Sequence, residues 1–398
     1  MSKKIKILLL TFYAPPDLSA GSFRVGALLE EARQRNDVIE IDCLTTLPNR
    51  YQEFEAEAKE FEEVDNVAIF RTKLPKHGNS MLGQIRSYLN YAWFVRQHLR
   101  SIRKDYDIVV ATSSRLMTGA LGAFCAMRMK KPLYLDIRDL FVDTMKGVLA
   151  RKKAKLILPF LSLLEKWTFR RAKKINVVSE GFVEDVRKVA PNVEIGVIPN
   201  GIDIEFLEPL PANPADEHLK VLYAGNIGEG QGLELTVPNV ARKLDGIVEF
   251  HIVGSGGRLG ALKENIAKCG ATNVHLHPPV SRSEVRNLYK DADVLFLQLN
   301  DYPAFKKVLP SKLFEYAATG KPIIAAIPGY SASFAEENIR GAIIVKPLDE
   351  EALVESFLSL KNNSSGHIDR RDFVAKYDRL ILSKMLLNDI INTVENVG

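Results

Sequence analysis

Short apolar runs alternate with longer amphipathic stretches along most of the chain. This alternation is typical of parallel strands that are buried on both faces of a sheet and joined by helices. A second series of runs begins afresh after residue 218, so the pattern predicts two doubly wound α/β domains. The predicted strands are residues 5–12, 38–44, 67–74, 107–112, 132–136, 174–179 and 194–199, followed by 219–224, 248–253, 274–276, 294–297, 322–326 and 342–345.

The proline-rich stretch Pro209–Pro214, preceded by Pro199–Asp203, separates the two series and is the best linker in the sequence. A chain of 398 residues also exceeds what one hydrophobic core usually supports. We therefore expect one Rossmann-like domain over residues 1–200 and a second over residues 201–370. Residues 371–398 are expected to form a helix that packs back toward the first domain, with apolar positions at Phe373, Tyr377, Leu380, Ile381, Met385 and Leu386.

Charge is divided unevenly between the two halves. Residues 1–200 contain 33 Lys and Arg against 23 Asp and Glu, and the remainder contains 21 against 26. A basic half favours anionic partners such as nucleic acid or anionic lipid, but no nucleic-acid-binding module is recognisable. Residues 81–103 and 146–174 interleave basic with aromatic and aliphatic residues, which suits helices in a membrane interface. The alternative is that their apolar sides are domain core and their lysines a solvated face.

The three cysteines, Cys43, Cys125 and Cys269, form no CxxC pair and no Cys/His cluster. Neither a disulfide framework nor a zinc site is expected. The lysines near the N-terminus lead directly into an apolar run that is too short for a signal peptide or a membrane span. These features favour a cytoplasmic protein.

Ligands of doubly wound sheets bind beyond the carboxyl ends of the strands, so functional residues are expected in the loops there. Two successive strands, 219–224 and 248–253, are each followed by a glycine-rich turn that leads into a helix. Glycine lets the backbone approach a phosphate, and a helix N-terminus favours its negative charge. The alternative is a tight turn that binds nothing. The candidate ligand-binding residues are Gly225, Asn226, Gln231, Gly254 and Gly256.

A third candidate is the short helix predicted between a start signal at Pro310 and Ser311 and a stop signal at Gly320 and Pro322. Lys312 and Glu315 are one turn apart and can face the same side. An ammonium there suits a diphosphate, and a carboxylate suits a ribose diol. The alternative is a salt-bridged surface pair.

Two loops of the first domain also carry candidates. The loop from Tyr13 to Arg24 follows the first strand and leads into a helix, which we expect to open at Ser22. Its candidates for contact with a ligand are Gly21, Ser22 and Arg24; the alternative for Arg24 is a cation on the helix surface.

The segment Asp136 to Asp139 follows the strand at 132–136 and places three charges at its carboxyl end. Asp139, Arg138 and Asp136 are catalytic candidates, because such a cluster can orient a substrate hydroxyl, accept its proton or bind further hydroxyls. The alternative is an Asp–Arg pair that braces the loop.

Taken together and in order, GNIGEGQGLE, HIVGSGG, LPSKLFEYAATGKP and VIPNGID resemble retaining glycosyltransferases of family 4, which have the GT-B fold of two Rossmann-like domains facing a central cleft. The branch that transfers N-acetylated amino sugars in O-antigen and capsule assembly, including N-acetyl-L-fucosamine transferases, is especially similar. YAPPDLSAGSFR and DIRDLFVD extend the resemblance over nearly the whole chain.

The resemblance implies a role for individual residues. Glu315 matches the second glutamate of the E-x7-E signature, which binds the donor ribose in relatives, whereas Lys307 stands at the position of the first. Asn226 and Gln231 occupy positions that are basic in many relatives. We therefore expect Lys312, with backbone N–H groups around Pro310, Ser311 and Leu313, to neutralise the donor diphosphate, and Lys306 and Lys307 are further candidates.

The implied reaction transfers a sugar from a UDP-sugar to a polyprenyl-diphosphate-linked saccharide with retention at the anomeric carbon. The expected location is the inner face of the plasma membrane, with peripheral attachment to its anionic surface. No nucleic-acid partner and no cofactor is expected. The Asp291-Ala292-Asp293 motif has the Asp-x-Asp form that holds a divalent metal in another glycosyltransferase fold, but here it precedes its strand and so lies at the edge of the sheet away from the ligand. No metal is therefore expected. A nucleotide-sugar epimerase and a non-catalytic partner subunit are the alternatives.

Overall fold

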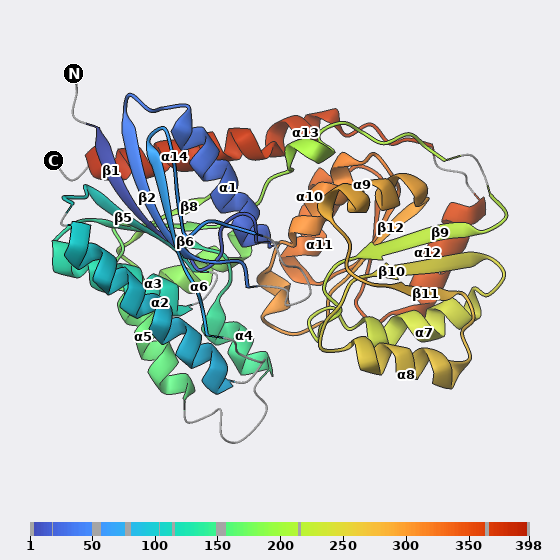
Figure 1. The fold of residues 1–398 in the computed structure, drawn as a ribbon. Helices are drawn as coiled ribbons and strands as arrows, with labels where there is room; N and C mark the ends of the chain where they lie inside the picture. The colour runs from blue at the N-terminus through green and yellow to red at the C-terminus, as the bar shows by residue number, and fades with distance from the viewer. Residues whose placement is uncertain are drawn as a thin grey trace. The chain divides into compact units, whose positions relative to one another are not determined.

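The computed structural model describes residues 4–17, 19–49, 57–75, 81–102, 104–113, 116–148, 157–213, 216–362 and 366–395. These residues form two compact units (Figure 1). The first comprises Met1–Gly201 together with Arg379–Gly398, and the second comprises Ile202–Asp378. The chain therefore enters the second unit once, leaves it once, and returns to the first unit for its last helix.

The first unit contains an eight-stranded sheet in the order β3-β4-β2-β1-β5-β6-β7-β8. All neighbouring strands are parallel except β3 and β4, which pair antiparallel at one edge. The central strands are buried on both faces because their side chains are almost all Ile, Leu and Val. The strands are β1 (Ile5–Leu10), β2 (Ile39–Thr46), β3 (Phe61–Val64), β4 (Val67–Thr72), β5 (Ile108–Thr112), β6 (Leu133–Ile137), β7 (Lys174–Val177) and β8 (Glu194–Val197).

Helices cover both faces of this sheet (Figure 1). Helix α14 packs against α1, and α3 packs against α5. The helices are α1 (Ala20–Arg33), α2 (Met81–Ile102), α3 (Leu116–Met129), α4 (Phe141–Val148), α5 (Leu158–Arg171), α6 (Val183–Val189) and α14 (Arg379–Glu395). Among the helices of the described residues, none is both long and apolar enough to cross a membrane.

The second unit contains a six-stranded parallel sheet in the order β11-β10-β9-β12-β13-β14. Its core joins the apolar faces of β9, β10 and β12 to α7 and α12. The strands are β9 (Leu219–Ala224), β10 (Val248–Val253), β11 (Val274–His277), β12 (Val294–Gln298), β13 (Ile323–Ala326) and β14 (Ala342–Val345). The helices are α7 (Leu233–Lys243), α8 (Leu259–Cys269), α9 (Arg282–Asp291), α10 (Ser311–Ala318), α11 (Gly329–Asn338), α12 (Glu350–Asn362) and α13 (Arg371–Tyr377).

Each predicted strand is present, with small shifts at the ends, so the two doubly wound sheets are confirmed. The edge strand β3 was missed because its sequence, FEEV, has no continuous apolar run and its side chains are largely exposed. The units divide between Gly201 and Ile202, within the Pro199–Asp203 part of the linker stretch, whereas Leu210 N donates to Thr319 O inside the second unit (2.9 Å).

The single C-terminal helix that we predicted is two helices. Asp378, with φ −56° and ψ 125°, interrupts the helix between α13 and α14. Tyr377 packs against Phe314 in the second unit, whereas α14 belongs to the first unit. Leu380, Ile381 and Met385, which we expected on the buried side, are consequently exposed.

Candidate functional site

The two glycine turns of the second unit touch each other at the carboxyl ends of β9 and β10. Gly225 N donates to Val253 O (2.8 Å), and Ile227 N donates to Ser255 O (2.9 Å). Gly254 has a φ of +146°, and a Cβ at this position would collide with the Gly225 carbonyl. The turns can pack this closely only because neither carries a side chain at the contact.

Helix α10 places a lysine over this contact. Pro310 is the N-cap residue, and Lys312 lies in the first turn, where the leading backbone N–H groups have no partner within the helix and Leu313 N donates to Pro310 O (3.1 Å). The ammonium of Lys312 lies so close to Gly225 that a Cβ there would collide with it. Three segments that are distant in sequence therefore meet at one point: the two glycine turns and the N-terminus of α10.

The Lys312 side chain is half-buried, and no protein group forms an ion pair with its ammonium among the described residues. Burial lowers the pKa of Lys312 below the ordinary 10.5, although Glu315 opposes this shift. Within the described part of the chain, no hydrogen bond of this ammonium is found either. A cation in this environment is stabilised by a bound anion.

Glu315 lies one turn further along α10, is buried, and has two protein partners. Its Oε1 accepts from Arg282 Nη2 (3.1 Å), and its Oε2 accepts from the Tyr289 hydroxyl (3.2 Å). Burial would lower the pKa of Arg282, but Glu315 and Asp203, to which Arg282 also donates, outweigh it and raise that pKa. The surface-pair alternative is therefore wrong: Glu315 is buried, and its ion-pair partner is Arg282 rather than Lys312.

The first glycine turn is braced by an amide pair. Asn226 Nδ2 donates to Gln231 Oε1 (3.0 Å), and Gly228 N donates to the same oxygen (3.2 Å). The two candidates thus fix the shape of the turn and contribute no charge. Lys307 lies in a short 3-10 turn, Phe305–Lys307, and the ring of Phe305 lies against Gly230.

In the first unit, helix α1 begins two residues earlier than predicted. Ser19 is the N-cap, and its side chain accepts from Ser22 N (3.1 Å). Gly21 and Ser22 are therefore buried in the first turn of the helix, at the carboxyl edge of the sheet. The Ser22 hydroxyl is buried and has no hydrogen-bond partner among the described residues.

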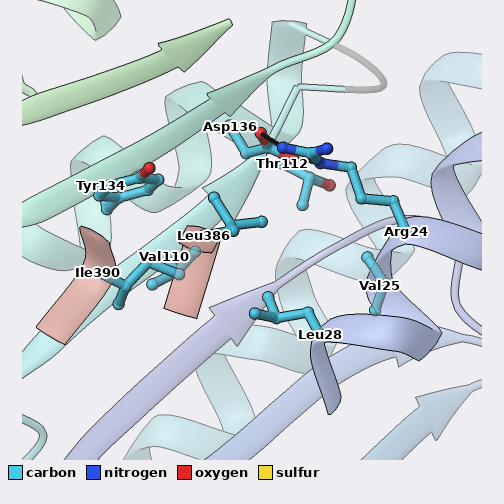
Figure 2. A pocket seen from close by; sticks show the side chains of 9 residues that line it. All are labelled: Arg24, Val25, Leu28, Val110, Thr112, Tyr134, Asp136, Leu386 and Ile390. Atoms are coloured by element: carbon cyan, nitrogen blue, oxygen red, sulfur yellow. Dashed lines mark hydrogen bonds and ion pairs between the residues drawn. The ribbon is translucent and has the colours of Figure 1, made fainter. Parts of the chain in front are cut away.

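Arg24 and Asp136 form a buried ion pair (Figure 2). Arg24 Nε and Nη2 donate to the two carboxylate oxygens of Asp136 (2.9 and 3.0 Å). Arg24 also donates to Pro199 O (2.7 Å) and Ile198 O (3.0 Å). Because Arg24 is buried, the alternative that it is a cation on the helix surface is wrong. Its geometry is that of a brace joining α1, β6 and the chain after β8.

Arg138 and Asp139 follow Asp136 beyond the end of β6. Arg138 Nη2 donates to Asn200 Oδ1 (3.2 Å), and its Nη1 is buried without a hydrogen-bond partner among the described residues. Burial lowers the pKa of Arg138 to about 10, against the opposing pull of Asp136. Asp139 is the exposed member of the segment. Of the three charged residues, Asp136 is thus paired with Arg24, whereas Arg138 and Asp139 follow it beyond the end of the strand.

Sequence reasoning missed Arg282, Tyr289 and the role of Asp203. Asp203 stands in the quoted VIPNGID motif, and a capping box formed by Ser281 and Glu284 marks the start of α9, so both positions carried a visible signal. Neither signal reveals that the two segments meet at Glu315.

The acidic motif before β12 has a structural role. Asp293 accepts from Lys220 N (2.9 Å) and from Asn213 Nδ2 (3.0 Å), which anchors the segment after the unit boundary. No group of three or more His, Cys, Asp or Glu side chains suited to a metal ion occurs in the part of the chain that the structure describes.

Two family models match the chain in succession. Residues 16–201 match the glycosyl transferase 4-like domain, and residues 210–379 match glycosyl transferases group 1. The chain is a GT-B glycosyltransferase. The models meet close to the point where the two units divide, so the family match and the fold agree on the organisation of the chain.

Known proteins resemble this glycosyltransferase over most of its length. A putative colanic acid biosynthesis glycosyl transferase, WcaI of Escherichia coli K12, is 27% identical over 294 residues, which are 67% of this chain and 71% of that protein. Sucrose-phosphate synthase from Thermosynechococcus elongatus matches 99% of this chain and 100% of its own, with a TM-score of 0.76 and 15% identity. Anabaena HepE in complex with UDP matches 98% and 100%, with a TM-score of 0.65 and 14% identity. The two solved structures show a shared GT-B fold.

Proposed function

We propose that this glycosyltransferase moves a sugar from a UDP-sugar to a hydroxyl of a lipid-diphosphate-linked glycan, with retention at the anomeric carbon. The observation that carries the proposal is the position of the Lys312 ammonium, which has no ion-pair partner among the described residues and lies where two glycine turns and a helix N-terminus meet. The UDP bound by HepE, a protein of the same fold, supports a nucleotide donor.

The donor diphosphate would lie between the glycine turns and α10. Lys312 supplies a full positive charge, and the N-terminus of α10 adds the partial charge of its N–H groups. Gly225 and Gly254 allow the diphosphate to approach the backbone. Glu315 retains acceptor capacity beside its two partners, because a carboxylate can accept about four hydrogen bonds, and it would bind the ribose diol.

Transfer would proceed on the face of the sugar that the leaving group occupies. The acceptor oxygen bonds to the anomeric carbon while the bond from that carbon to the β-phosphate oxygen breaks, and this oxygen takes both the electron pair and the acceptor proton. Stabilising the charge that develops on the leaving diphosphate is then the main contribution of the protein, and Lys312 is placed for it. We assign Arg138 and Asp139 to the acceptor hydroxyl or the donor sugar, and Asp136 to holding Arg24.

The transferred sugar is proposed to be an N-acetylated amino sugar in the assembly of O-antigen or capsule. The likeness to WcaI, whose name places it in colanic acid biosynthesis, supports a role in surface polysaccharide synthesis. A lipid-linked acceptor would require the enzyme to work at the inner face of the plasma membrane as a peripheral protein. The excess of basic residues in residues 1–200 supports attachment to an anionic surface.

The first experiment is a thermal-shift panel of nucleotides and nucleotide sugars, because a ligand that binds only the folded state raises the melting temperature. UDP and one UDP-sugar are expected to raise it. Transfer is then measured as UDP release that depends on a lipid-linked acceptor. Product formed from the donor alone would indicate an epimerase, and failure to bind any UDP-sugar would indicate a non-catalytic subunit.

Lys312→Ala tests the site directly. Removing a charged group that stabilises the leaving diphosphate is expected to lower kcat about 100-fold or more. Lys268→Ala is the matched control, because Lys268 is an exposed lysine of α8 that pairs with the exposed Glu264. Unchanged turnover of Lys312→Ala in a folded protein would refute the assignment.

A further inference from the structure

Three helices of the first unit, α2, α3 and α5, form one layer on the same side of the sheet (Figure 1). The Tyr88 hydroxyl of α2 donates to the carbonyl of Met117 in α3, and α3 packs against α5. The outer sides of the three helices therefore form one continuous surface, which we call the three-helix face.

Large apolar side chains are exposed on all three helices of this face. On α2 they recur every fourth residue at Ile85, Leu89 and Trp93, so they lie in a single stripe. Exposure is high: 61% for Trp93, 65% for Phe160 and 66% for Leu163. Soluble monomers seldom expose this much contiguous apolar surface without using it. The apolar members of the face are Ile85, Leu89, Trp93, Met117, Phe124, Met127, Phe160 and Leu163.

The opposite sides of the same helices form domain core. Tyr91 and Val95 of α2 and Phe169 of α5 are buried. The alternative that the apolar sides of these stretches belong to the domain core is therefore correct for one side of α2 and of α5. It does not account for the exposed side. Helix α3 contacts both of the other helices and makes the surface continuous. Residues 149–156 of the basic stretch at 146–174 lie outside the described residues.

The charge on the three helices has one sign. Their seven basic residues are Arg86, Arg96, Arg100, Arg128, Lys166, Arg170 and Arg171, whereas Glu165 is their only acidic residue. Glu165 is buried and accepts from Val142 N (3.4 Å). No acidic side chain of these helices is thus exposed among the described residues, and the apolar stripe is bordered by arginine and lysine.

We infer that the three-helix face binds the headgroup and upper acyl region of an anionic lipid bilayer. Apolar side chains inserted to this depth gain from burial, and a tryptophan at the level of the headgroups matches its amphipathic ring. The surrounding basic side chains attract anionic lipids. Self-association through this face would instead bring two sets of seven cations together. This inference rests on the proposed peripheral attachment, and it names the surface that makes the attachment.

The chain contains two tryptophans, Trp93 and Trp167, which makes the inference directly measurable. In Trp167→Phe, Trp93 is the only tryptophan, and its fluorescence reports on the face. With vesicles of phosphatidylcholine and phosphatidylglycerol, the emission should shift to the blue and be quenched by lipids brominated near the headgroup. Vesicles of phosphatidylcholine alone should produce a much smaller effect.

The matched variants separate this face from apolar surface elsewhere. Leu89→Ser combined with Phe160→Ser and Leu163→Ser should lower flotation with anionic vesicles at least 10-fold. Leu235→Ser combined with Leu348→Ser, which removes exposed leucines of the second unit, should leave it unchanged. Circular dichroism and melting temperature verify that each variant is folded.

Three outcomes would overturn the inference: no change in Trp93 emission with anionic vesicles, equal flotation of the two sets of variants, or a lipid-free dimer in analytical ultracentrifugation that the triple variant converts to monomer. Transfer to a water-soluble acceptor analogue is measured in parallel. Activity without vesicle binding would reject this surface and leave the proposed reaction standing. Vesicle binding without any transfer would reject the reaction and leave the surface.

Discussion

Mutation of the buried ion pair between Arg24 and Asp136 can distinguish a structural role of Arg24 from a role in ligand binding. Arg24→Met removes four hydrogen bonds: two to Asp136 and one each to the carbonyls of Pro199 and Ile198. Asp136 then remains buried with Asn176 as its remaining amide donor (2.7 Å). Breaking a buried ion pair on one side costs about 3–5 kcal/mol, because an uncompensated charge stays behind.

The expected loss is large enough to measure in a thermal scan. For a domain of about 200 residues, 1 kcal/mol corresponds to about 2–4 °C, so the melting temperature of the first unit should fall by about 6–20 °C. The assay is differential scanning calorimetry, together with urea unfolding of Arg24→Met, Asp136→Asn and the double variant. The two single changes should be strongly non-additive, because either one already breaks the pair.

The pair also predicts how stability responds to acid. Burial would raise the pKa of Asp136, but Arg24 outweighs it and holds the pKa below the ordinary 3.8. A depressed carboxyl pKa stabilises the folded state above the unfolded-state pKa, and this stabilisation is lost as pH falls through the folded-state value. Arg24→Met should therefore remove stability at neutral pH and flatten its dependence on pH below about 4.

The contrary result is equally specific. If Arg24 contacts the donor phosphate, Arg24→Met will weaken UDP binding while leaving the melting temperature and the urea midpoint unchanged. UDP affinity is measured by isothermal titration calorimetry at a temperature where both proteins are folded. A stable variant that binds UDP poorly would refute the structural role of Arg24 and support its contact with the donor phosphate.

Three further predictions concern the second unit. Because burial lowers the pKa of Lys312, UDP affinity should fall as pH rises through that lowered value, below the ordinary 10.5, and calorimetry should show that Lys312→Arg moves the fall to higher pH. Glu315→Gln should destabilise the unit by about 1.5–3 kcal/mol in urea unfolding, since Arg282 loses a buried charged partner, and it should raise the KM for the UDP-sugar. Gly254→Ala forces a Cβ against the Gly225 carbonyl, so it should lower the melting temperature and weaken UDP binding together; weaker binding alone, without destabilisation, would contradict the packing of the two turns.

The sheets were predictable from the sequence because burial on both faces leaves a continuous apolar run. Leu219–Ala224 and Val248–Val253 have the bounds that the pattern predicts. The edge strand Phe61–Val64 carries no such signal, because its side chains are largely exposed. The break at Asp378 was also not predictable, because apolar residues recur on both sides of it. Local spacing does not show that the two helices pack in different units.

The candidate site was predictable where its residues come from strand ends and only there. Gly225, Gly254 and Lys312 meet because β9 and β10 are neighbours and α10 begins at the same edge, which strand order alone implies. The partner of Arg24 is 112 residues away, and that of Glu315 is 33 residues away, and neither spacing has a local signature. Such pairs depend on packing between elements, which periodicity along one element does not report.

The most direct measurement is a crystal structure of the protein soaked with UDP. Diphosphate oxygens are expected at hydrogen-bond distance, about 2.7–3.2 Å, from Lys312 Nζ and from backbone N–H groups of the turn after β9, with the ribose beside Glu315. Nucleotide density elsewhere on the chain, or a diphosphate that leaves Lys312 without contact, would contradict the assignment of the donor site.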